Sequence, residues 1–365
     1  MAIEPTGDEQ ALVDQYALPW IEANEDRSSD ADVHLRSYAS SLENDGADAT
    51  KAVERLLSSG RGEAMKALDE HWARVHAYFG RTARAAVTIA SGIGECGDVI
   101  VVGKHRAQDL IAHFAAVRPT VGNDAQHRML QQQADATRRD LRESAATALS
   151  DTRAGAARAQ ADPDVATLGT IPAHLAGLLG GGAGGGLGQG IGTGIAAGVA
   201  GISGGVGAGV AGISGGVGAG VAGIAGGGGR AGMTGDGGGA GDGGVSGGAG
   251  PQVGANARSW NVFVDHDEHK RAADGLTRTA ENIRGKTTTT LARARFDLDA
   301  LAASGSLGAS IAADYAPLLD HLDSATQALA GHLHGPLRNL VLSMSTGQKK
   351  TDEANRDRLG RLDRG

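Results

Sequence analysis

A glycine-rich stretch without charged residues limits what the middle of this chain can fold into. No Lys, Arg, Asp or Glu occurs from Val165 to Gly229 in a chain of 365 residues. Within Gly190–Ala225 the sequence repeats as AAGVAGISGGV, GAGVAGISGGV and GAGVAGIAG. Its large apolar residues are spaced three or four positions apart in an 11-residue period, which is the periodicity of a helix and not of a strand.

Nine glycines follow the same spacing, each one residue before a β-branched residue. This candidate glycine zipper comprises Gly194, Gly198, Gly201, Gly205, Gly209, Gly212, Gly216, Gly220 and Gly223. Because glycine costs a helix about 1 kcal/mol per residue, the 15 glycines of Gly190–Ala225 oppose a lone helix in water by about 15 kcal/mol. Two interpretations stay open: a flexible, disordered linker, or a conditional helix that forms when the segment is paired or inserted in a membrane.

A helix over the repeat would be about 54 Å long, against about 30 Å for a bilayer core. Glycine and alanine are weakly apolar, so insertion of one chain is marginal, and close packing through the zipper would have to supply the rest. We therefore expect that the repeat can permeabilise membranes as a helical oligomer. If the native repeat causes no vesicle leakage, or if leakage rises when four zipper glycines are replaced by leucine, the repeat is a linker.

Composition outside the insert favours an all-α fold and argues against several functions. Ala, Leu, Arg, Asp and Glu dominate there, and aromatic residues make up only 3% of the chain. The net charge is −8 and arises in the first 164 residues, so no basic face for nucleic acid is expected. Cys96 is the only cysteine, which excludes an intrachain disulfide. The first residues, MAIEPTGDEQ, lack the features of a Sec signal peptide.

The apolar periodicity predicts two long helical hairpins joined by the glycine-rich segment. We expect an N-terminal tail at 1–30, a first hairpin at 31–120, an amphipathic helical arm at 121–164, the glycine-rich insert at 165–254, a second hairpin at 255–348 and a polar tail at 349–365. The second helix of the first hairpin carries a candidate interaction face formed by Met65, Leu68, Trp72, Val75 and Phe79. This helix has an apolar face longer than one short helix can cover, so we expect a homodimer or a complex with a small hairpin protein.

Short motifs in residues 18–114 and 308–315 carry a family resemblance. They are Leu18-Pro19-Trp20, Leu35-Arg36 with Ala39, the turn residues Gly60, Gly62 and Ala64, Lys104 on the long return helix, and Gly308-x-x-Ile311-Ala312-x-Asp314-Tyr315. These residues resemble the Trp-x-Gly family of type VII (ESX) secretion substrates over about half of the chain. The resemblance implies an export-competent, WXG-like helical hairpin that pairs with another hairpin into a four-helix bundle, in a mycolate-type actinobacterium.

Two family motifs are missing from this sequence. The family's turn tryptophan falls at Gly60 in the first unit and at Ser306 in the second. The family's export signal, a tyrosine followed four residues later by Asp or Glu, does not occur at any of the four tyrosines. We therefore expect either that a partner carries the export signal or that the protein is not exported.

The sequence holds no constellation that indicates catalysis, a cofactor or a metal. The best metal candidate is His266-Asp267-Glu268-His269, for which a solvated helix start is the simpler interpretation because no third ligand is fixed nearby. His332 and His334 are two positions apart and point different ways on a helix, which argues against a shared metal, and surface or packing roles suffice for His71 and His76. No Gly-Lys-Ser/Thr follows the glycine strings, so they are not a phosphate-binding loop.

The sequence thus predicts a non-enzymatic type VII secretion substrate or secretion-associated protein. It would act through helical-bundle contacts with a partner or with the ESX machinery, and it would be exported by a non-Sec route or lie in the cell envelope. One alternative is a cytoplasmic helical scaffold with a flexible glycine linker, which the missing export signal supports. A second is a toxin or effector of the WXG-like class.

Overall fold

The computed structural model describes residues 2–61, 63–118, 123–180 and 266–347. These residues form helices and connecting turns and no strand, so the predicted all-α class is confirmed. In chain order the helices are α1 (Gly7–Tyr16), α2 (Glu25–Ser59), α3 (Glu63–Val117), α4 (Asp124–Ala161), α5 (Pro163–Thr167), the 3-10 turn η1 (Leu168–Thr170), α6 (Ile171–Gly180), α8 (His266–Asn282), the π-turn η2 (Ile283–Thr287), α9 (Thr288–Ala302), α10 (Ser306–His332) and the π-turn η3 (Leu333–Leu337).

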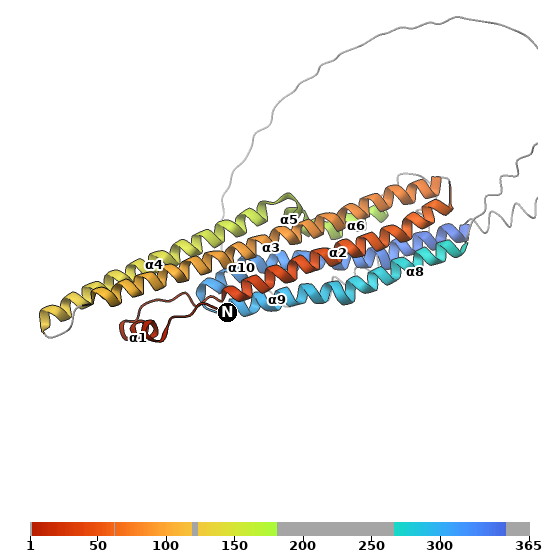
Figure 1. Ribbon diagram of the computed structural model, residues 1–365. Coiled ribbons are helices and arrows are strands. Elements are labelled where there is room, and N and C mark those ends of the chain that lie inside the picture. The colour runs from red at the N-terminus through yellow and green to blue at the C-terminus, as the bar shows by residue number, and fades with distance from the viewer. Residues whose placement is uncertain (1, 62, 119–122, 181–265, 348–365) are drawn as a thin grey trace, which may run out of the picture. The chain divides into compact units, whose positions relative to one another are not determined.

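The first hairpin consists of α2 and α3, which run antiparallel and pack along the whole length of α2 (Figure 1). Asn24 begins α2 because its side chain accepts a hydrogen bond from the Asp26 backbone N–H, which would otherwise lack a helical partner. This cap places the start of α2 inside the segment predicted as an N-terminal tail. That segment also contains α1, so residues 1–30 are folded over most of their length.

The second hairpin consists of α8, η2 and α9 on one side and α10, η3 and residues 338–347 on the other. Its turn brings the backbones so close that two glycines are required. Gly305 has a φ of 95°, which side chains with a Cβ rarely adopt. A Cβ on Gly308 would lie 2.1 Å from the carbonyl oxygen of Leu301.

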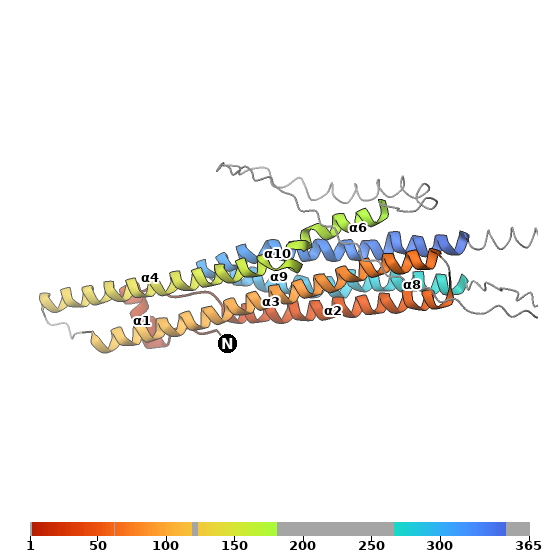
Figure 2. The same ribbon diagram turned by 90° about the horizontal axis from the view of Figure 1, so that it is seen from above.

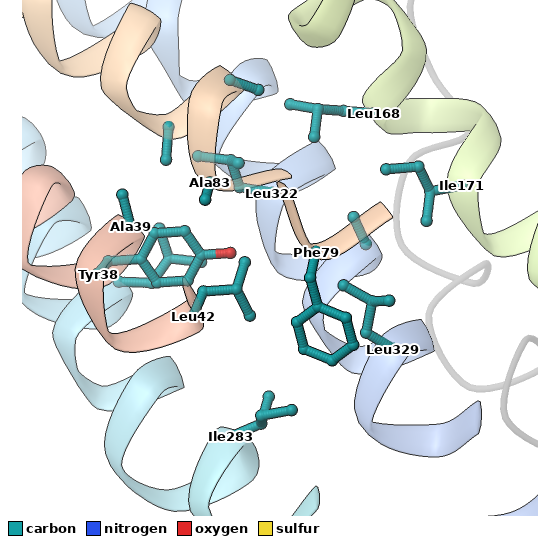
Figure 3. Close-up of a cluster of buried hydrophobic side chains, with 14 of the residues drawn as sticks. Tyr38, Ala39, Leu42, Phe79, Ala83, Leu168, Ile171, Ile283, Leu322 and Leu329 are labelled. Atoms are coloured by element: carbon teal, nitrogen blue, oxygen red, sulfur yellow. The ribbon is translucent and has the colours of Figure 1, made fainter. Parts of the chain in front are cut away.

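The two hairpins pack together into a four-helix bundle within one chain. Figures 1 and 2 show α2 beside α8 and α9, and α3 beside α10, in agreement with the contacts between these elements. One hydrophobic core runs through all of them. Figure 3 shows a section of it, where Leu42 of α2, Phe79 of α3, Ile283 of η2 and Leu322 of α10 converge. The chain therefore covers its own apolar faces.

The predicted arm and the start of the predicted insert are parts of the packed structure. Helix α4 returns along α3, and the N-terminal half of α4 forms a second small core with α1 and the C-terminal end of α3, around Phe114, Leu130 and Leu141. Residues 165–180, which were assigned to the glycine-rich insert, form helical turns over α3 and α10 and bury Leu168 and Ile171. The insert that follows, including the whole glycine zipper, lies outside the described residues.

Candidate functional site: the interface between the two hairpins

The predicted interaction face is buried inside the chain's own bundle. Met65, Leu68, Trp72, Val75 and Phe79 are each at most 5% exposed and belong to the core shared with the second hairpin. The spacing of these residues therefore identified a real packing face. What covers it is helical, as expected, but it comes from residues far along the same chain.

The predicted turn residues divide between the two hairpins. Gly60 ends α2 with an extended backbone, and a Cβ there would meet only the flexible end of the Met65 side chain. Ala64 is half-buried against the core, and Gly62 lies outside the described residues. Gly308 must be a glycine, because its backbone lies so close to the Leu301 carbonyl that no side chain fits.

We call the contact between the first and the second hairpin the seam. A buried carboxylate on α2, that of Asp45, lies in it. Asp45 accepts hydrogen bonds from the Asn282 amide and from the Thr287 hydroxyl, the latter at 2.6 Å. Burial raises the pKa of Asp45, although these two hydrogen bonds partly oppose the rise. A buried carboxylate is costly unless it is hydrogen-bonded, so these two donors, together with the charge of Lys286, stabilise the buried Asp45.

The π-turn η2 explains how both partners reach Asp45. Two residues five positions apart on an α-helix point about 140° away from each other. In a π-turn the hydrogen bond runs from i to i+5, and the wider turn brings position i+5 back over position i. Asn282, which precedes η2, and Thr287, its last residue, therefore face the same carboxylate.

Three further polar contacts cross the seam from α2. The Tyr38 hydroxyl contacts the Thr326 hydroxyl, and Thr326 in turn donates to the Leu322 carbonyl at 2.7 Å, so Tyr38 must be the donor to Thr326. Nearer the second turn, the buried Asp297 binds His34 at 2.7 Å and Arg27 at 3.2 Å. Each contact links residues more than 260 positions apart.

On the α3 side of the seam, His71 lies against His332, with 2.9 Å between their Nε2 atoms. His332 is buried and His71 packs against it, a contact that the sequence did not predict. His269, expected at a solvated helix start, is also buried. Among the described residues no group of three or more His, Cys, Asp or Glu side chains is placed to hold a metal ion.

Cys96 lies beneath a shallow pocket of about 270 Å³ between α3 and α4. Its sulfur is 4.0 Å from the Tyr315 hydroxyl of α10, and an ion pair of 2.8 Å between Arg158 and Glu95 spans the rim. Burial raises the pKa of the thiol to about 11, with Glu95 adding to the rise, so the thiolate required for nucleophilic chemistry is scarce at neutral pH. The pocket therefore lacks an activated nucleophile.

Helix α3 has the length and composition of a membrane-spanning helix, with a mean hydropathy of 1.6 in its most apolar window. Half of that window is buried in the bundle, and core packing is sufficient to explain its composition. A buried ion pair of 2.6 Å joins Lys104 of this helix to Glu25 at the start of α2. Lys104 was one of the residues on which the family resemblance rested, and its charge is used inside the fold.

The seam contacts were missed because their partners are distant in sequence. Asp45, Asp297 and the two histidines stand in ordinary helical surroundings when the sequence is read locally. A signal existed only for Asp45, which interrupts an apolar stripe. The chain matches no family model, no curated protein and no solved structure.

Proposed function

We propose that this protein is a non-enzymatic helical-bundle protein of the type VII secretion class, as a substrate or as a secretion-associated component. The observation that supports the proposal is the pairing of two helix-turn-helix units, each with long antiparallel helices, across one shared core. The family resemblance implies such a four-helix bundle between two hairpins. In this chain both hairpins belong to one polypeptide.

Export is tested by comparing culture filtrates of the wild-type host and of a host without the ESX ATPase. The proposal expects the protein in the wild-type filtrate and its loss from the mutant filtrate, while the cytoplasmic amount stays the same or rises. A cytoplasmic marker protein in both filtrates controls for lysis. Equal amounts outside both hosts, or none outside either, would favour the cytoplasmic scaffold.

The proposed partners are a second copy of the chain or a small WXG-like hairpin protein. Since α2 and α3 are already covered within the chain, such a partner would have to bind an outer surface or displace the second hairpin. Sedimentation of the full chain at micromolar concentration shows whether it associates with a second copy of itself. Purification from the native host, with identification of any co-purified hairpin protein, shows whether it binds a small WXG-like partner. A compact monomer without a co-purified partner would contradict this part of the proposal.

A further inference from the structure

The two histidines in the seam meet end to end. Their ring centroids are 5.1 Å apart and their planes differ by 18°, while the two Nε2 atoms are 2.9 Å apart. The centroid distance exceeds the nitrogen distance by 2.2 Å, which is about two ring radii, so the rings lie in line and are not stacked face to face. This is the geometry of an N–H···N hydrogen bond, in which one neutral ring donates and the other accepts.

The surroundings of this pair favour neutral rings. Burial lowers the pKa of His332 to about 4, with a further contribution from His71. Burial also lowers the pKa of His71, and the nearby Arg74 on α3 adds to the effect. Within the described part of the chain no carboxylate contacts either ring or contributes to either shift. The seam's own carboxylates, Asp45 of α2 and Asp297 of α9, are bound by other side chains.

We propose that His71 and His332 form a proton-operated latch, and that mild acid loosens the docking of the second hairpin on the first. The neutral pair needs a single shared N–H. One added proton places a charge in a desolvated position beside Arg74, and a second would set two donors against each other. Rings released into water regain an ordinary pKa near 6.5, so opening of the seam takes up protons.

The direction of the pH effect follows from the lowered values. The pair's contribution to stability is complete above about pH 6.5 and is lost progressively as the pH falls toward 4, where His332 titrates in the folded protein. Asp45 works in the opposite direction, because burial raises its pKa and acid therefore relieves a buried charge there. A variant that lacks only the histidines separates the two effects.

Hydrogen exchange of the full chain, followed by mass spectrometry, tests the latch. With intrinsic rates corrected for pH, the opening equilibrium of the α10 amides should increase on the order of 20-fold between pH 7 and pH 5. Amides of the outer α3–α4 region, which belong to the second core, provide an internal control and should change much less. No increase in α10 over this pH range would overturn the proposal.

Variants assign the effect to the pair. His71→Gln combined with His332→Gln keeps amide groups that can hydrogen-bond but cannot titrate, and it should remove most of the increase. His334→Gln is the control, because it changes an exposed histidine two residues after His332 and leaves the buried pair intact. This variant should respond to pH as the wild type does. If the double variant does not fold, His332→Gln takes its place. An increase equal to that of the wild type in the folded variant would refute the latch.

Discussion

Replacing Gly308 by alanine tests the tight turn of the second hairpin at a single atom. The added Cβ would lie 2.1 Å from the Leu301 carbonyl oxygen and 3.0 Å from the Ser304 hydroxyl oxygen. The first neighbour is backbone, so relief requires that the end of α9 and the start of α10 move apart by more than an ångström. The core on both sides of this turn opposes such a movement, because Leu301 and Ile311 are buried in it.

The magnitude follows from two opposing effects. Overpacking of this kind costs about 1 to 3 kcal/mol and occasionally more, and backbone contact places Gly308 at the upper end. Alanine gains up to about 1 kcal/mol of helix propensity over glycine. We expect a net loss of about 2 kcal/mol, which corresponds to a decrease in Tm of roughly 4 to 8 °C for a bundle of this size.

Gly331→Ala provides the matched control, because it makes the same chemical change in the same helix. A Cβ at Gly331 would meet no heavy atom within 4 Å, so only the helix propensity changes. Its Tm should increase by about 2 to 4 °C. Thermal unfolding of both variants, followed by circular dichroism at 222 nm, gives the comparison. A Gly308→Ala protein as stable as the control would refute the close approach on which the estimate rests.

Three further predictions concern buried polar groups. Lys104→Met should lower the free energy of unfolding by about 3 to 5 kcal/mol, because it leaves the Glu25 carboxylate buried without its cation. Lys51→Met, at an exposed pair, should change the free energy of unfolding by less than about 1 kcal/mol, and equal effects of the two variants in urea denaturation would contradict the burial argument. Burial favours a higher pKa for Glu25, but hydrogen bonds from Lys104 and the Ile3 backbone outweigh burial, and the pKa of Glu25 is lowered. The wild type should therefore lose the stability that this ion pair contributes as the pH falls below 4.5. The difference in free energy of unfolding between wild type and Lys104→Met should narrow between about pH 7 and pH 3.5. Thr287→Val keeps the shape but removes one donor to the Asp45 carboxylate, and should cost about 1 to 3 kcal/mol; an unchanged urea midpoint would show that this contact contributes nothing.

The helices could be predicted from the sequence because their apolar residues repeat at helical spacing. The stripe from Met65 to Phe79 identified the buried face of α3, and the glycines near the second turn located the reversal of the chain. Helix α1 was missed because it is short and carries no extended apolar stripe. Residues 165–180 carry a stripe at helical spacing, from Val165 to Leu178, but this stripe was assigned to the charge-free insert that follows it.

The seam could not be predicted because it depends on how two hairpins that are far apart in the sequence align. The residues that Asp45 binds are 237 and 242 positions away along the chain, and His71 is 261 positions from His332. Local periodicity fixes which face of a helix is apolar, but it does not fix the register between two helices so far apart. The same limit explains why the sequence did not indicate that the second hairpin of the same chain covers the first.

The two π-turns have a consequence for how this bundle tolerates changes in chain length. A π-turn accommodates one residue more than the α-helical turn it replaces, so η2 and η3 act as single-residue insertions absorbed within continuous helices. Deleting Gly285 would restore an α-helical path and leave the following residues of α9 close to their present direction relative to α8, because four α-helical steps of about 100° cover nearly the same rotation as the five steps of the wider turn. Asn282 and Thr287 would then stand four positions apart, as neighbours on one helix face, so both would still face the Asp45 carboxylate. Each helix of the second hairpin contains one such insertion, so either side of this hairpin can lose one residue and keep its apolar face directed at the core.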